Sequence, residues 1–157
     1  HEIVVVPNGP EQVELRAARP GVSLALGGRD QVLLSYVNLS AVLAAVQAGT
    51  GDLAIVCAGR NGRFSLEDAA CAGALTHMLT QARPSLEMND AAAVARDYHR
   101  EHGHAPEQIL RRSEHGRYLI ELGFEEDLPV CAAVDSAPVV PLLRDGRIAA
   151  APADPRG

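Results

Sequence analysis

The chain has 157 residues, a length typical of one domain, and 47% of them are hydrophobic. Only 3% are aromatic, so a core must be built from alanine, valine and leucine. All 14 basic residues are arginines, and 20 acidic residues bring the net charge to −6. The sequence has no basic stripe of the kind that binds nucleic acids, and the negative charge disfavours binding to an anionic membrane surface.

Strands and helices alternate over the first 84 residues. Branched apolar runs predict strands at 3–6, 32–37 and 53–57 and a shorter one at 22–26. The predicted helices lie at 11–19, 39–48 and 66–83. Pro10 suits the first turn of the first helix, Asn38 is the expected N-cap of the second, Ser65 caps the third and Pro84 ends it.

This βαβαβα order predicts an α/β fold, in which a mostly parallel sheet carries helices on both faces. In such sheets a ligand binds in the loops at the carboxyl ends of the strands. These loops contain Asn8 and Gly9, Asn38, and the segment 59–65. We therefore expect three polar loops to meet at one edge of the sheet.

A helical segment and a C-terminal hairpin follow Pro84. Helices are predicted at 89–101, 106–112 and 114–122, strands of a hairpin at 139–143 and 147–150, and a disordered tail at 151–157. The polar turn 113–116 is interpreted as a plain helix start. We expect one α/β domain over 1–157, with a core at 1–84 and the helical segment and hairpin at 85–150. Because the chain opens directly in a strand, we expect this domain to be incomplete.

The most informative stretch runs from Cys57 to Gly73. A buried strand ends in a glycine-rich loop with two arginines, and a helix follows. Gly59 lets backbone amides turn toward a ligand, and Arg60 and Arg63 can bind phosphate or sulfonate in forked geometry. The alternative is that the arginines are ordinary solvated surface residues.

Two adjacent carboxylates, Glu67 and Asp68, stand in the first turn of that helix. One interpretation is a capping box, in which Asp68 reaches back to the amide of Ser65. The other makes Glu67 or Asp68 a magnesium ligand, since Mg²⁺ prefers one or two carboxylates and keeps several waters. Both can hold at once, because a capping carboxylate has a second oxygen free.

These residues, in this order, resemble the C-terminal two thirds of the 2-phosphosulfolactate phosphatase family. The resemblance covers nearly the whole chain, from Ile3 to about Ala150. The segment 57–73 carries most of the resemblance. Supporting matches are 7–9, 38–42, 113–117, Leu119, Gly123, Asp127, Cys131, 140–141 and the C-terminal hairpin. The resemblance implies an unusual α/β fold and a magnesium-dependent phosphatase that releases phosphate from 2-phospho-3-sulfolactate, a step toward coenzyme M.

Two features differ from the family pattern. Members begin with a segment carrying an Asp-Val-x-Arg-Ala motif, which this sequence does not contain, and Pro10 stands where members usually have threonine or serine. An alternative function is therefore a catalytically impaired remnant that binds anions or regulates.

Our first hypothesis is metal-assisted hydrolysis of a phosphate monoester. Glu67 and Asp68 would be the catalytic and Mg²⁺-binding residues. The substrate would be bound by Asn8, Gly9, Asn38, Gly59 and Arg60. No apolar run is long enough for a membrane span, no secretory signal is visible, and the three cysteines are dispersed, so we expect a cytoplasmic protein. The alanine-rich surface and the truncated sheet edge favour a homodimer.

Overall fold

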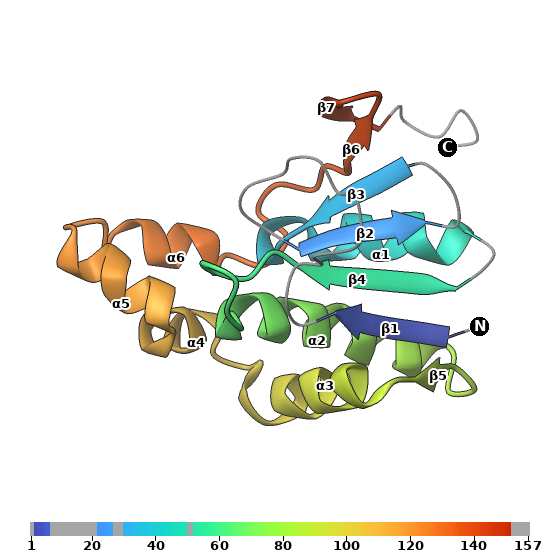
Figure 1. Cartoon of the computed structure of the whole chain (residues 1–157), viewed down its shortest axis with the longest axis horizontal. Helices are drawn as coiled ribbons and strands as arrows, with labels where there is room; N and C mark the ends of the chain where they lie inside the picture. Colours follow the sequence, from blue (N-terminus) through green and yellow to red (C-terminus); the bar gives the residue numbers. More distant parts are fainter. Residues whose placement is uncertain (1, 7–21, 27–29, 50–51, 152–157) are drawn as a thin grey trace.

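The structure is a computed structural model that describes residues 2–6, 22–26, 30–49 and 52–151 (Figure 1). The strands are β1 (Glu2–Val6), β2 (Val22–Leu26), β3 (Asp30–Leu34), β4 (Leu53–Cys57), β5 (Glu87–Met88), β6 (Pro141–Arg144) and β7 (Arg147–Ala150). The helices are η1 (Tyr36–Asn38), α1 (Leu39–Ala48), α2 (Leu66–Ala82), α3 (Asp90–His102), α4 (Pro106–Arg112), α5 (Glu114–Glu121) and α6 (Asp127–Cys131). The helix predicted at 11–19, the site residues Asn8 and Gly9, and the tail 152–157 lie outside the described residues.

One mixed sheet has the strand order β5-β1-β4-β2-β3-β6-β7. The prediction of a mostly parallel sheet is wrong: β1 pairs in parallel with β4 and β5, whereas β2 is antiparallel to β3 and β4, and β6 is antiparallel to β3 and β7. The reason is the short connection between β2 and β3, residues 27–29. A parallel pair needs a crossover of a dozen or more residues, so these two strands can only form a hairpin.

The reversed strand β2 leaves β3 and β4 pointing the same way as β1. Val22 of β2 pairs with both Leu34 of β3 and Cys57 of β4, and Val6 of β1 pairs with Val56. The carboxyl ends of these three strands therefore lie along one edge, which Figure 1 shows as neighbouring arrowheads. Two strand spacings put the ends of β3 and β4 about 10 Å apart.

The described helices α1, α2 and α3 pack side by side against the sheet (Figure 1). Alternate residues of β3 and β4, among them Leu34 and Ile55, form the core with Val42 of α1 and Leu75 of α2. The helices thus cover one face in the described part of the chain, where the sequence predicted both faces. Cys57 and Cys71 are buried in this core, as expected of small apolar fillers.

Two further parts extend from this body in Figure 1: the helices α4 to α6, beyond the carboxyl edge, and the hairpin β6–β7, at the far edge of the sheet. The predicted C-terminal helices and hairpin agree with the structure to within a few residues. Within the described ranges, every helix is too short or too polar to cross a lipid bilayer.

Candidate functional site

The loop after β4 is a tight turn that its sequence specifies. Arg60 and Arg63 exchange two backbone hydrogen bonds of 3.0 and 2.9 Å, and Asn61 and Gly62 between them have φ of 52° and 72°. Left-handed backbone at both central positions is the requirement that Asn-Gly pairs meet best. The turn therefore fixes where the backbone of Arg60 lies.

The first turn of α2 is fastened to this loop. Ser65 caps the helix, since its Oγ accepts a hydrogen bond of 3.2 Å from the amide of Asp68, as predicted. The carboxylate of Asp68 turns instead to the loop, where Oδ2 accepts a 2.8 Å hydrogen bond from the amide of Gly59. Gly59 has a φ of 68°, which suits glycine. Its amide is therefore used by Asp68 and is not free for a ligand.

Asp68 is an unusual carboxylate. Burial raises its pKa above the ordinary value, and the neighbouring charge of Glu67 raises it further. The hydrogen bonds from Gly59 and Ser65 and the nearby His115 act in the opposite direction without cancelling the rise. The surroundings of Asp68 therefore favour its charged form less than water does, and a cation placed beside it would favour that form.

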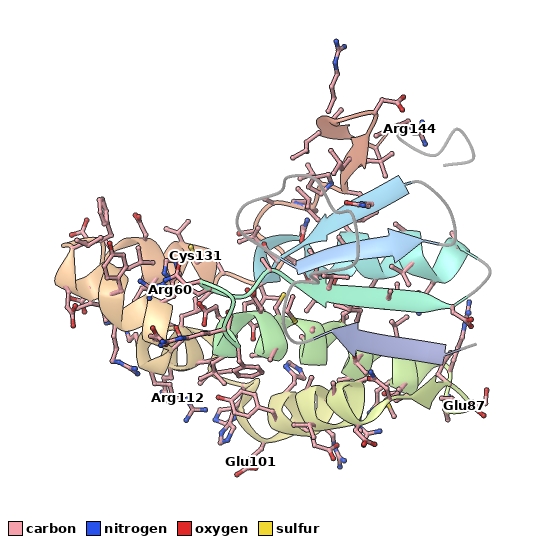
Figure 2. All side chains as sticks on the ribbon, in the orientation of Figure 1. Arg60, Glu87, Glu101, Arg112, Cys131 and Arg144 are labelled. Carbon is pink, nitrogen blue, oxygen red and sulfur yellow. The ribbon has the colours of Figure 1, made fainter. Side chains whose placement is uncertain are left out.

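A pocket of about 200 Å³ opens between the first turns of α2 and α5. Its lining residues are Arg60, Phe64, Ser65, Leu66, Glu67, Arg112, Ser113, Glu114 and His115. Figure 2 labels the two arginines, which lie on the side of the molecule where α4 and α5 extend beyond the sheet. The pocket thus combines the amino ends of two helices with two guanidinium groups.

Both arginines contact a tyrosine ring and an uncharged oxygen. Arg60 donates from Nη1 to the carbonyl oxygen of Glu114 at 3.3 Å, and its Cζ lies 4.4 Å from the centre of the Tyr118 ring. Arg112 donates from Nη2 to the hydroxyl of Tyr98 at 2.5 Å, and its Cζ is 5.6 Å from that ring. No carboxylate of the described residues lies within 4.0 Å of either guanidinium. Their positive charges remain available to an anion.

The wall contributed by α5 depends on Ser113. Its Oγ accepts from the amide of Gly116 and donates to the carbonyl of Leu110, both at 2.9 Å. A side chain on Gly116 would come within 1.8 Å of that same carbonyl, so α4 and α5 approach as closely as glycine allows. Beside them, Nδ1 of His115 is buried without a partner among the described residues.

Sequence reasoning missed this wall. The turn 113–116 was interpreted as a plain helix start, and nothing in the sequence placed it opposite Ser65, which lies about fifty residues earlier. Two signals mark this segment: the sequence Ser-Glu-His-Gly, a capped helix start with an imidazole in the first turn, and the resemblance of residues 113–117 to the family. The first signal indicates a helix start, and neither defines its neighbour in space.

Asn38 does not line this pocket, and its side chain is bonded elsewhere. Its amide donates to the carbonyls of Leu33 and Val139 at 3.0 and 3.1 Å, and its Oδ1 accepts from Ser35 at 2.8 Å. The side chain therefore joins three backbone segments by hydrogen bonds. It makes no capping hydrogen bond to α1, so the prediction that its side chain caps this helix is wrong. Asp135 caps α1 instead, accepting from the amide and hydroxyl of Ser40 at 2.7 and 2.6 Å.

The described residues do not contain a group of three or more histidine, cysteine, aspartate or glutamate side chains that could hold a metal ion. Glu67 lines the pocket, as does a second acidic residue, Glu114, and Asp68 follows Glu67 in the chain. An ion such as Mg²⁺, which keeps most of its waters, fits two carboxylates of this kind, whereas an ion that needs a full protein cage does not.

The family model for 2-phosphosulpholactate phosphatase matches residues 24–146, a range that includes both walls of the pocket. The chain belongs to this family. Its relatives include proteins named probable 2-phosphosulfolactate phosphatase from Symbiobacterium thermophilum, 34% identical over 77% of the chain, and from Thermotoga petrophila, 38% identical over 73%. A third, from Carboxydothermus hydrogenoformans, is 36% identical over 79%. The chain spans about half the length of these family members.

Proposed function

We propose that this protein is a magnesium-dependent phosphatase that hydrolyses the phosphate monoester of a small acidic metabolite such as 2-phospho-3-sulfolactate, in a pathway of the coenzyme M type. The observation that carries the proposal is the pocket of about 200 Å³, which two helix amino ends and two arginines line; neither arginine pairs with a carboxylate of the described residues. The family and the names of its relatives support the reaction. They do not favour the alternative of an impaired remnant.

The positive groups of the pocket would bind the substrate's anions. The first turns of α2 and α5 contribute the positive ends of the helix dipoles, which favour phosphate. Arg60 and Arg112 add guanidinium groups that match the geometry of phosphate and sulfonate oxygens. These local charges attract an anion although the whole chain carries a net charge of −6.

Glu67 and Asp68 would hold the magnesium ion. When bound, Mg²⁺ neutralises phosphate oxygens and orients a water for attack. Glu67 lines the pocket, and Asp68 is fixed by the amide of Gly59 through one oxygen, which leaves its other oxygen for the ion or its waters. A bound cation would also favour the charged form of Asp68, which burial disfavours.

The test is phosphate release from 2-phospho-3-sulfolactate with Mg²⁺ and with excess EDTA. We expect release only with the metal, and a loss of at least tenfold for Arg60→Ala and for Glu67→Gln, on the order of one charged hydrogen bond or metal ligand. Arg147→Ala is the matched control, because this exposed arginine lies on β7, outside the pocket. No release by the wild-type protein with Mg²⁺, or equal losses in the control, would refute the proposal.

A further inference from the structure

Aromatic residues are scarce in this protein, and their placement is informative. The chain has three tyrosines, two phenylalanines and no tryptophan. Two of the three tyrosines lie under the two arginines of the pocket, Tyr118 under Arg60 and Tyr98 under Arg112. Neither Tyr98 nor Tyr118 lines the pocket itself. The tyrosines therefore act on the pocket through the arginines.

Tyr118 holds Arg60 by its ring. The guanidinium carbon is 4.4 Å from the ring centre, within the range of a cation–π contact, and the ring itself is stacked near that of His115, with centroids 6.4 Å apart at 25°. Together with the carbonyl of Glu114, the ring limits the rotamers that Arg60 can adopt. One of the five N–H donors of the Arg60 guanidinium makes a hydrogen bond to the described residues, so the others can serve an anion.

We propose that Tyr118 is a positioning residue that holds Arg60 in the orientation in which its guanidinium receives the anionic group of the substrate. This rests on the proposed function for the identity of the anion. Because a freely rotating arginine loses side-chain entropy on binding, a braced one binds more tightly for the same contacts. The contact between Tyr118 and Arg60, called the brace below, therefore affects the affinity for the substrate's anion. It does not touch the reacting atoms.

The first measurement needs no ligand. The Nε–Hε resonance of Arg60 in the NMR spectrum of the free protein should show an upfield ring-current shift. We expect the shift to persist in Tyr118→Phe, which keeps the ring, and to disappear in Tyr118→Leu. Phe124→Leu is the matched control, because Phe124 is a similarly exposed aromatic residue just after α5 and outside the pocket. An unchanged Arg60 resonance in Tyr118→Leu would overturn the proposal.

The second measurement is calorimetric binding of 3-sulfolactate and of inorganic phosphate. Tyr118→Leu should weaken binding about two- to fivefold, the range of an exposed cation–π contact, while Tyr118→Phe and Phe124→Leu bind as the wild type does. In an Arg60→Ala background the Tyr118→Leu change should have no further effect. An equal loss in both backgrounds would show that Tyr118 acts independently of Arg60 and would overturn the proposal.

The two measurements separate this inference from the function on which it rests. A ring-current shift that follows Tyr118 as expected, with no binding of either anion by the wild type, would refute the proposed function and leave the brace as a structural contact only. Anion binding that depends on Arg60 but not on Tyr118 would support the function and refute the brace. Thermal unfolding of each variant checks that it is folded, so that a changed resonance or weaker anion binding is not caused by loss of the fold.

Discussion

Replacing Asp68 by asparagine or alanine separates what this side chain does for the fold from what its charge does. The carboxylate accepts a 2.8 Å hydrogen bond from the amide of Gly59 and so fastens the loop after β4 to α2. Asparagine keeps an oxygen that can accept this bond, whereas alanine does not. A partly buried amide left without its acceptor costs about 1–3 kcal/mol, so Asp68→Ala should lower the free energy of unfolding at pH 7 by that amount.

Asp68→Asn should be as stable as the wild type at pH 7 or more so, because it removes a charge that burial disfavours. The sign follows from proton binding. A raised pKa means that the folded state binds the proton of Asp68 more tightly than the unfolded state does. The stability that this gives is present at low pH and is lost as the pH rises from the ordinary value of 3.8 through the folded pKa.

The assay is urea unfolding of the wild type and both variants at intervals between pH 4 and pH 7. The difference between wild type and Asp68→Asn isolates this group, since the other titrating groups are shared. The wild type should lose stability relative to Asp68→Asn as the pH rises. If Asp68→Asn proves as unstable as Asp68→Ala at pH 7, or if the difference does not change with pH, the reasoning from burial is refuted. Phosphate release should fall in both variants if Asp68 binds the metal.

Three other outcomes are expected. Asn38→Ala should lower the free energy of unfolding by about 2–4 kcal/mol in urea titrations, because it leaves three partly buried backbone groups without partners. The Kd for 3-sulfolactate of the folded fraction should stay unchanged. Gly116→Ala should cost about 1–3 kcal/mol and weaken anion binding, because its Cβ would push α5 away from the carbonyl of Leu110; wild-type affinity in calorimetry would contradict this. Of the free thiols, exposed Cys131 should react first with a thiol reagent at pH 8, and Cys57, whose pKa burial raises to about 12, only on unfolding; simultaneous reaction would contradict this.

Local features of this fold could be predicted because their causes are local. The Ser65 cap depends on neighbouring backbone, and the C-terminal helices follow from Pro106, Ser113 and the spacing of apolar residues. The direction of β2 could have been deduced from the length of the 27–29 connection. It was missed because the alternation of the longer strands and helices dominated the pattern.

Only one wall of the candidate site could be predicted. Its residues follow one another closely in the sequence, whereas the other wall comes from a distant part of the chain. Arg60 and Glu67 follow β4 within a dozen residues, so the strand–loop–helix pattern was enough to single them out. His115 and Arg112 reach the pocket through the packing of α4 and α5, which no short-range signal encodes. Asn38, at a strand end, is predicted to bind a ligand, and its amide donates to two backbone carbonyls in contacts that the local sequence does not encode.

The contact between Asn38 and Val139 joins residues 101 positions apart and has a consequence for the order of assembly. Until residue 139 has been synthesised, one N–H of this amide lacks its acceptor, and the start of α1 also lacks the carboxylate of Asp135. The contacts at the junction between β3 and α1 can therefore be completed only after the C-terminal segment has been synthesised. Contacts of such long sequence separation slow folding, so this junction adds to the non-local contacts that the chain must form.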